Sequence, residues 1–284
     1  MSLGIALAGG GLKGIAYIGA LKALNELGVK PDYLSGTSSG SIFASFYAMG
    51  FTPEEMKPRA EQYYKMLTSL DKKPILKAGV TYATTGVAKI EGIIPGERIS
   101  SLVSELATEK KIDNMNQIDM NFAICTVDTI STNECIFLSK ECKIKDENID
   151  YIYNAPIGIA TRASMSFPAI FTPCNYDKYN FIDGGTKDNL PVKILKNMGA
   201  EKTLALSFKI DAYEPKEDIF AILLRAVDIF SLEDVRNAQK IADLCIEIDA
   251  AGTGLLEIDD FDKLIKIGYD TIMKNKDKIL ELIK

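Results

Sequence analysis

The stretch IALAGGGLKGIAYIGALKAL, residues 5–24, reads as a strand that breaks into glycines and restarts as a helix. Gly9, Gly11 and Gly14 satisfy the spacing G-x-G-x-x-G, which dinucleotide-binding folds use at a pyrophosphate. Glycines let the backbone approach a ligand closely, and the helix start behind them favours negative charge. The stretch therefore predicts an anion site, and a dinucleotide is one alternative for the anion.

A second motif follows in YLSGTSSGSIFASFYAMG, residues 33–50, where Gly36-Thr37-Ser38-Ser39-Gly40 joins a short strand to a helix. This is G-x-S-x-G in the strand-turn-helix setting of a nucleophile elbow, with Gly36 and Gly40 beside the serine because the turn is tight. The alternative is that Ser38 only caps the helix. Both glycine motifs end successive strands, so we expect them to face one crevice and the anion to be an oxyanion.

A dinucleotide site also needs an acidic residue at the end of the second strand. The nearest acid, Asp32, precedes that strand instead. This absence weakens the dinucleotide alternative without removing it.

Any catalytic base must be Asp, Glu, Lys or Tyr, because the chain contains no histidine. That count excludes Ser-His-Asp and Cys-His catalysis and histidine-based zinc sites. A candidate stands in YNFIDGGTKDNLPVKIL, residues 179–195, where an apolar run ends at Asp183 beside Gly184 and Gly185. The alternative is an ordinary turn aspartate in an Asp-Gly pair.

The composition fits a globular α/β protein. Of 284 residues, 47% are hydrophobic, which allows one large or two small domains, and we predict a single domain over 1–284. Lys and Arg number 33 against 39 Asp and Glu, and the net charge of −6 argues against a nucleic-acid partner. The five cysteines are scattered, so we expect reduced thiols and a cytoplasmic protein. No apolar run approaches the ~20 residues of a spanning helix, so we expect no transmembrane segment.

Apolar runs alternate with helical patterns, which predicts βα units around a mainly parallel sheet. We expect strands near residues 3–8, 33–36, 121–127, 134–139, 203–208 and 244–248, and helices near 13–27, 39–49, 54–69, 97–108, 155–163, 192–198, 218–230 and 260–282.

Two segments stand apart from this alternation. Residues 72–95 are the least periodic region and are predicted to form a flap or lid, with an ordinary surface excursion as the alternative. Residues 255–284 are predicted to form a C-terminal closing helix that packs on the core, with a membrane-surface helix as the alternative.

Taken in order, the motifs resemble those of the patatin-like phospholipase family over nearly the whole chain. They are the glycine loop Gly9-Gly10-Gly11-Leu12-Lys13-Gly14, the elbow at residues 36–40, and Asp183-Gly184-Gly185. ATRASMSFPAIFTP, residues 160–173, and NLPVKILKNMGA, residues 189–200, also resemble family segments. One departure is Ala8, where the family usually has an acidic residue. The resemblance implies a three-layer α/β/α sandwich and a Ser-Asp dyad that needs neither metal nor cofactor.

On this resemblance, Ser38 attacks an ester carbonyl and Asp183 accepts its proton, with a pKa raised by burial. Backbone amides around Gly10, Gly11 and Leu12 would hold the oxyanion. Lys13 would orient the loop or meet a lipid phosphate, with a solvated lysine as the alternative.

The implied activity is that of a phospholipase A, lysophospholipase or esterase working at a membrane or micelle surface, cytoplasmic or peripheral to a membrane. Alternatives with the same dyad are a soluble carboxylesterase, a thioesterase and an acyltransferase. Outside enzymes, a dinucleotide-binding or lipid-binding module stays open.

Overall fold

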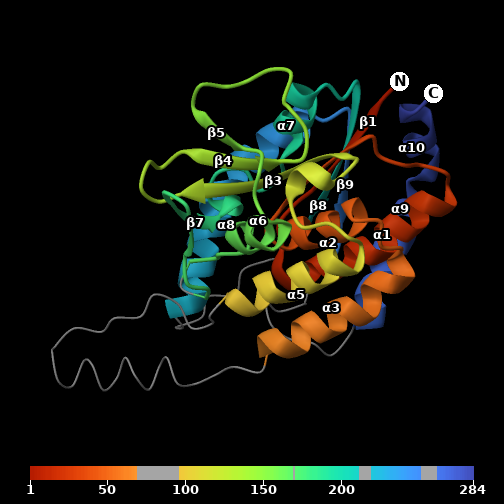
Figure 1. Ribbon diagram of the computed structural model, residues 1–284. Coiled ribbons are helices and arrows are strands. Elements are labelled where there is room, and N and C mark those ends of the chain that lie inside the picture. The colour runs from red at the N-terminus through yellow and green to blue at the C-terminus, as the bar shows by residue number, and fades with distance from the viewer. Residues whose placement is uncertain (69–95, 169, 211–218, 251–260) are drawn as a thin grey trace, which may run out of the picture.

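The computed structural model describes residues 1–68, 96–168, 170–210, 219–250 and 261–284. Within them, one mixed sheet has the strand order β5-β4-β3-β2-β1-β8-β9, with β7 pairing both β3 and β6 (Figure 1). The strands are β1 (Leu3–Leu7), β2 (Tyr33–Thr37), β3 (Asn121–Asp128), β4 (Glu134–Leu138), β5 (Ile149–Ile152), β6 (Cys174–Tyr176), β7 (Tyr179–Asp183), β8 (Lys202–Phe208) and β9 (Leu244–Ile248).

The centre of the sheet is parallel. Strand β1 pairs in parallel with β2 and β8, and these pair in parallel with β3 and β9. Every residue of β1 is buried, as expected for a strand covered on both faces. The carboxyl ends of these five strands lie along one edge, which we call the carboxyl edge.

Helices cover both faces of the sheet. Alternate residues of β1 point to opposite sides: Ile5 joins the larger core, while Ala6 joins a second core. The larger core includes α1 (Ala16–Glu26), α2 (Ser39–Ala48), α3 (Pro53–Thr68), α5 (Glu97–Glu109), α6 (Ile157–Ser164), α9 (Phe261–Lys274) and α10 (Lys276–Leu282), and the opposite face is covered by α7 (Val192–Met198) and α8 (Ile219–Ile241). The expected α/β fold with a mainly parallel sheet between helical layers is confirmed.

The C-terminal segment packs against the first helix. A methyl group at Gly19 of α1 would lie 1.8 Å from the Ile265 carbonyl oxygen, and one at Gly268 of α9 would lie 1.8 Å from that of Ala16. The two backbones can therefore touch only because both positions lack a side chain. Residues 261–284 form two helices, α9 and α10, where the sequence predicted one, and the rest of that prediction, 255–260, lies outside the described residues.

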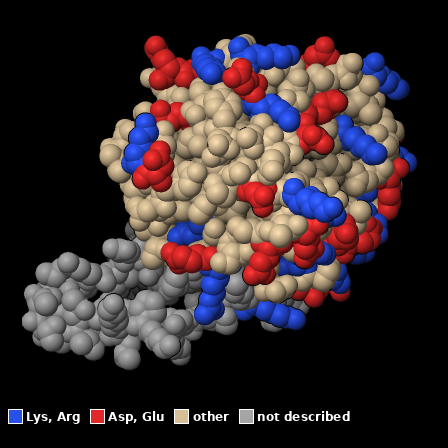
Figure 2. All heavy atoms as spheres, in the orientation of Figure 1, with Lys and Arg blue, Asp and Glu red and all other residues tan. Residues whose placement is uncertain are grey.

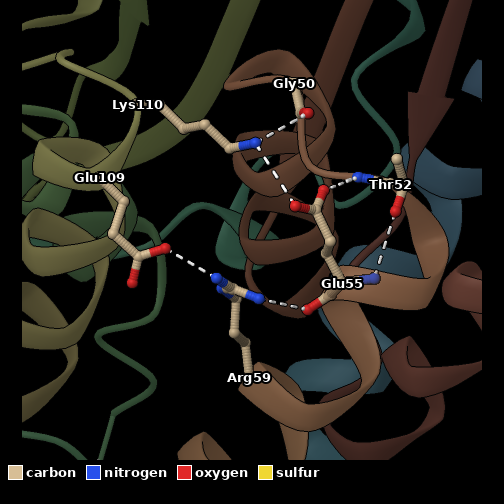
Figure 3. Close-up of polar contacts among 6 residues, drawn as sticks. All are labelled: Gly50, Thr52, Glu55, Arg59, Glu109 and Lys110. Carbon is tan, nitrogen blue, oxygen red and sulfur yellow. Dashed lines mark hydrogen bonds and ion pairs between the residues drawn. The ribbon is translucent and has the colours of Figure 1, made fainter.

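Helices α3 and α5 are joined by polar contacts (Figure 3). Thr52 and Glu55 form a capping box at the start of α3: the Thr52 amide donates to Glu55 Oε2 (2.8 Å), and the Glu55 amide donates to Thr52 Oγ1 (3.3 Å). Arg59 then pairs with Glu109 (2.7 Å), and Lys110 pairs with Glu55 (3.7 Å). The predicted flap, 72–95, follows α3 in sequence and lies outside the described residues.

Charged side chains of both signs are interleaved on the face drawn in Figure 2. Neither sign gathers into a broad patch among the described residues of that face, consistent with the small net charge of −6. Among the helices that the structure describes, none has the length and apolar character needed to cross a membrane.

Candidate active site

Ser38 occupies a strained turn between β2 and α2. Its φ of 53° and ψ of −127° lie in a region that side-chain-bearing residues rarely adopt. A methyl group at Gly36 would lie 2.6 Å from the Gly40 carbonyl oxygen, and one at Gly40 would lie 2.2 Å from that of Leu7, so the sharp turn requires both glycines. The Ser38 side chain makes no capping hydrogen bond, so the alternative that it only caps α2 is wrong.

Ser164 of helix α6 holds the elbow in place through hydrogen bonds. The Ser38 amide donates to Ser164 Oγ (2.9 Å), and Ser164 Oγ donates to the carbonyl oxygen of Cys125 on β3 (2.7 Å). The Ser38 hydroxyl itself points toward Met165 Sδ, 3.9 Å away. Sequence reasoning noticed the small-residue segment that carries Ser164 but gave this serine no role.

The glycine loop, residues 9–14, packs against the elbow. A methyl group at Gly9 would lie 2.9 Å from Ser38 Cβ, and one at Gly14 would lie 2.8 Å from Ser39 Cβ. The loop and the nucleophile candidate are therefore in contact at the same edge of the sheet, as the strand order predicts. Lys13 is half-buried on this loop.

The amides of the glycine loop differ in what they bind. The Gly9 amide donates to the Asn189 carbonyl oxygen (3.1 Å), and the Gly10 amide donates to Ser39 Oγ (3.0 Å). Gly10 was expected among the oxyanion donors, but its amide is already engaged, which corrects that expectation. The amides of Gly11 and Leu12 begin the short helix η1 (Gly11–Ile15), where N–H groups have no partner within the helix.

Asp183 ends β7 and is buried, with 1% of its surface exposed. Its Oδ1 accepts a hydrogen bond from the Gly185 amide (2.8 Å), whereas Oδ2 is buried with no hydrogen-bond partner among the described residues. Burial raises the pKa of Asp183 to about 7, and the nearby Ser38 hydroxyl and the Gly185 amide oppose this rise. A methyl group at Gly184 would lie 2.3 Å from the Cys125 carbonyl oxygen, so the chain after Asp183 also needs glycine.

One edge of β3 brings Ser38 and Asp183 together. Strand β2 pairs along that edge until Thr37 lies opposite Cys125. Strand β4 occupies the other edge, so β7 continues where β2 stops and places Asp183 opposite Thr126, the next residue of β3. The serine after Thr37 and the aspartate therefore become neighbours although far apart in sequence. They do not form a hydrogen bond of normal geometry here, because the hydroxyl points toward Met165 and Asp183 Oδ2 is unpaired.

The loop after Asp183 ties the three motifs to one another. Thr37 Oγ1 donates to the Asp188 carbonyl oxygen (2.7 Å), and Asn189 Nδ2 donates to the Gly9 carbonyl oxygen (3.4 Å). Sequence reasoning assigned no role to Thr37, Asp188 or Asn189. The only available signal was their place within the motifs.

A buried arginine helps to hold Asp183 in place through Ser166. Arg162 is 2% exposed and donates to Ser166 Oγ and to the Thr172 carbonyl oxygen. The Ser166 carbonyl oxygen in turn accepts the Asp183 amide (3.0 Å). Arg162 therefore helps to set the position of β7, a role that the sequence did not predict.

Cys125, Glu134 and Asp188 are the described residues whose side chains lie close enough to hold a metal ion, with their ligand atoms within 4.8 Å of one another. Burial raises the pKa of Glu134 to about 7 and also raises the pKa of Asp188 and of the Cys125 thiol. Burial disfavours ionisation of both carboxyl groups, so their proximity by itself does not indicate an ion, and we assign no metal to this cluster. The expectation that the chemistry needs no metal stays a prediction.

Comparison with known proteins connects this geometry to a described family. The family model described as "Patatin-like phospholipase" matches residues 5–196, a range that contains the glycine loop, the elbow and Asp183. Mouse patatin-like phospholipase domain-containing protein 6 is 29% identical over 207 residues, which cover 72% of this chain and 13% of the mouse protein. Lysophospholipase nte1 of Aspergillus oryzae is 26% identical over 297 residues, covering 94% of this chain and 17% of that protein.

The chain thus spans less than a fifth of the length of these curated relatives. Among solved structures, VipD from Legionella pneumophila superposes with a TM-score of 0.52 at 15% identity, covering 98% of this chain and 67% of that one. At this identity the likeness concerns the fold alone.

Proposed function

Because this chain belongs to the patatin-like phospholipase family, we propose that it is a hydrolase of lipid acyl esters with Ser38 as nucleophile and Asp183 as general base. The observation that carries the proposal is the succession of β2 and β7 along one edge of β3, which sets a strained serine beside a buried carboxylate. The unpaired Asp183 Oδ2 and a pKa of about 7 suit a carboxylate that must take a proton near neutral pH.

In the acylation step, the Ser38 hydroxyl turns from Met165 toward Asp183 Oδ2, a short rotation that apo sites commonly require. Ser38 Oγ forms a bond to the ester carbonyl carbon, and its proton passes to Asp183. Collapse of the tetrahedral intermediate breaks the ester bond, and the leaving alcohol takes the proton from Asp183. The product is an acyl-serine and a free alcohol.

The negative charge of the tetrahedral intermediate falls on the former carbonyl oxygen. We assign its stabilisation to the amides of Gly11 and Leu12, which start η1 and lie on the loop packed against Ser38. The helix start adds a favourable partial charge. In the deacylation step, Asp183 removes a proton from water, and the hydroxide forms a bond to the acyl carbon. The bond between that carbon and Ser38 Oγ then breaks, Ser38 Oγ takes the proton from Asp183, and a free fatty acid leaves.

The substrate class follows from the relatives. Several are named lysophospholipases, so a lysophospholipid is the first substrate to test. A soluble carboxylesterase, a thioesterase and an acyltransferase use the same dyad and differ only in the leaving group or acceptor. We propose that the enzyme works at the surface of a membrane or micelle, and the cytoplasmic location remains a prediction from the cysteine pattern.

The test is labelling by a fluorophosphonate together with turnover of a lysophospholipid, a phospholipid, a monoglyceride and an acyl-CoA. We expect the wild-type protein to be labelled at Ser38, and Ser38→Ala and Asp183→Asn to lose turnover while remaining folded. Ser101→Ala and Asp119→Asn, which change exposed residues of the same types, are matched controls and should keep full activity. No labelling of the wild-type protein, or full turnover by Asp183→Asn, would contradict the proposed dyad.

A further inference from the structure

Exposed apolar side chains are unevenly distributed between the two edges of the sheet, and more of them lie toward the edge that carries the candidate active site. Among the described residues, eight large hydrophobic side chains are exposed. Five of them lie toward the carboxyl edge: Ile130, Ile210, Ile222, Ile229 and Phe230. The uneven distribution is informative, because scattered exposed apolar residues are normal whereas clustered ones mark binding surfaces.

The topology places these five residues at this edge. Ile130 follows the carboxyl end of β3, and Ile210 follows that of β8. Helix α8 runs from the carboxyl end of β8 back to the start of β9, so its N-terminal half lies nearest the carboxyl edge. In Figure 1, α8, β7 and the carboxyl end of β3 lie on one side of the molecule and both chain termini on the other.

The two halves of helix α8 differ in the exposure of their described apolar side chains. Val235 and Ala238, in its C-terminal half, pack on the core beneath the sheet. In the N-terminal half, Ile222, Ile229 and Phe230 recur at a spacing that puts them on one helical face, and Phe230 is 73% exposed. Helix α8 also contacts η3 (Gly184–Thr186), the turn directly after Asp183.

We propose that Ile222, Ile229 and Phe230 of α8, with Ile130 and Ile210, form a docking surface for a lipid bilayer or micelle. This inference rests on the proposed function, because a lipid hydrolase must draw an acyl chain from an aggregate into a site at the same edge. Helices with an exposed apolar face insert it into the boundary between headgroups and acyl chains. The surface is apolar and the protein carries a net charge of −6. We therefore expect it to bind zwitterionic lipid without needing anionic lipid, and we expect the binding to change little with salt concentration.

The chain offers a matched control for this surface. Ile144 and Ile241 are also exposed, but they lie toward the opposite edge: the Ile144 amide bonds to Asn197 near the end of α7, and Ile241 ends α8. A double substitution Ile229→Gln with Phe230→Gln therefore compares directly with Ile144→Gln plus Ile241→Gln. Both pairs replace exposed residues, so neither should disturb the core.

The experiment measures sedimentation of each protein with phosphatidylcholine vesicles, in a Ser38→Ala background so that the lipid is not consumed. We expect the α8 double variant to partition about tenfold to a hundredfold less than the parent, because each buried apolar side chain contributes strongly. The opposite-edge variant should partition like the parent. Activity is measured separately on proteins that keep Ser38. Hydrolysis of a monomeric short-chain ester should be equal for the parent and both double variants, while hydrolysis of vesicle lipid should fall only in the α8 variant.

The outcomes separate this inference from the proposed function. Vesicle binding that is absent, equal in both double variants, or dependent on anionic lipid would overturn the docking surface even if the short-chain ester is hydrolysed. Absence of ester hydrolysis with α8-dependent vesicle binding would overturn the proposed function and leave the docking surface standing. If ultracentrifugation shows a dimer that only the α8 variant dissociates, and vesicles are not bound, the surface contacts a second copy instead and the inference is wrong.

Discussion

Asp183 ends β7 and Asp188 lies on the loop that follows it. Burial raises the pKa of both, yet their neighbours differ in kind. Asp183 lies beside the Ser38 hydroxyl and accepts the Gly185 amide. Asp188 lies beside Glu134, with Asp234 also nearby, so its acidic neighbours raise its pKa further, and Lys193 opposes the rise. A raised pKa therefore identifies buried carboxyl groups in general, and only the neighbouring nucleophile distinguishes a catalytic one.

The largest effect should come from removing the carboxylate of Asp183, with the same substitution at Asp188 as the comparison. Asp183→Asn cannot accept the serine proton, and we expect kcat/KM for a p-nitrophenyl ester to fall by about 10²–10⁴-fold. Asp188→Asn should change it by less than about threefold, because a side chain that does not face Ser38 contributes no proton transfer. Equal losses of kcat/KM in the two variants would contradict the proposal that only Asp183 takes part in proton transfer.

The pH dependence of turnover sharpens the same contrast. The base must be ionised, and the pKa of Asp183 is raised to about 7. The rate of acylation should therefore rise with pH, falling about tenfold for each pH unit below 7 and levelling above it. A pH profile of kcat/KM measures the midpoint. Asp188→Asn should keep the midpoint, and a profile that is flat from about pH 5 to 8 would contradict Asp183 as the base.

Stability should respond to pH through the cluster around Asp188. Glu134 has a folded pKa of about 7, above its ordinary value, so ionising it in the folded protein costs free energy. This penalty is absent below the ordinary pKa, grows as pH rises from there to about 7, and stays constant above about 7. Glu134→Gln removes it and should raise the free energy of unfolding at about pH 8, relative to about pH 5, by on the order of 1–3 kcal/mol. Urea unfolding at the two pH values is the check, and a variant that loses stability equally at both would show that Glu134 is held by another interaction.

The smallest effect concerns the hydrogen bond that joins the elbow to the Asp188 loop. Thr37→Val keeps the shape of the side chain but loses the bond from Thr37 Oγ1 to the Asp188 carbonyl oxygen. We expect a loss of about 1 kcal/mol in the free energy of unfolding and a change in kcat of less than about fivefold. Thermal unfolding and initial rates measure both. A loss of activity as large as that of Asp183→Asn would mean that the elbow and the loop act as one unit.

Much of the site could be predicted because its signals are local in sequence. The two glycine motifs and the Asp-Gly-Gly triplet each follow a strand, and their backbone requirements restrict the residue types within a few positions. Strand order, in contrast, depends on pairing between distant segments. Nothing in the sequence of β2 or of β7 indicates that the two strands pair, one after the other, with the same edge of β3.

The elements and residues that the sequence did not predict have similar causes. Strands β5 and β6 are short and only partly buried, so they lack the apolar runs that marked the other strands. Helix α8 extends to Ile241, beyond the predicted end near 230, because the polar stretch that follows Phe230 still has strong helix formers. Ser164 and Arg162 were missed because serine and arginine are common residues whose role depends on which backbone groups they reach.

The contact between Gly19 and Gly268 has a consequence for the order of events during synthesis. Helix α1 continues directly from the glycine loop, and its outer surface is covered by α9, one of the last described helices to leave the ribosome. Until α9 emerges, α1 exposes the backbone and the apolar side chains that α9 will cover. The glycine loop of a nascent chain is therefore left without its final support although every residue of the candidate site has already been translated.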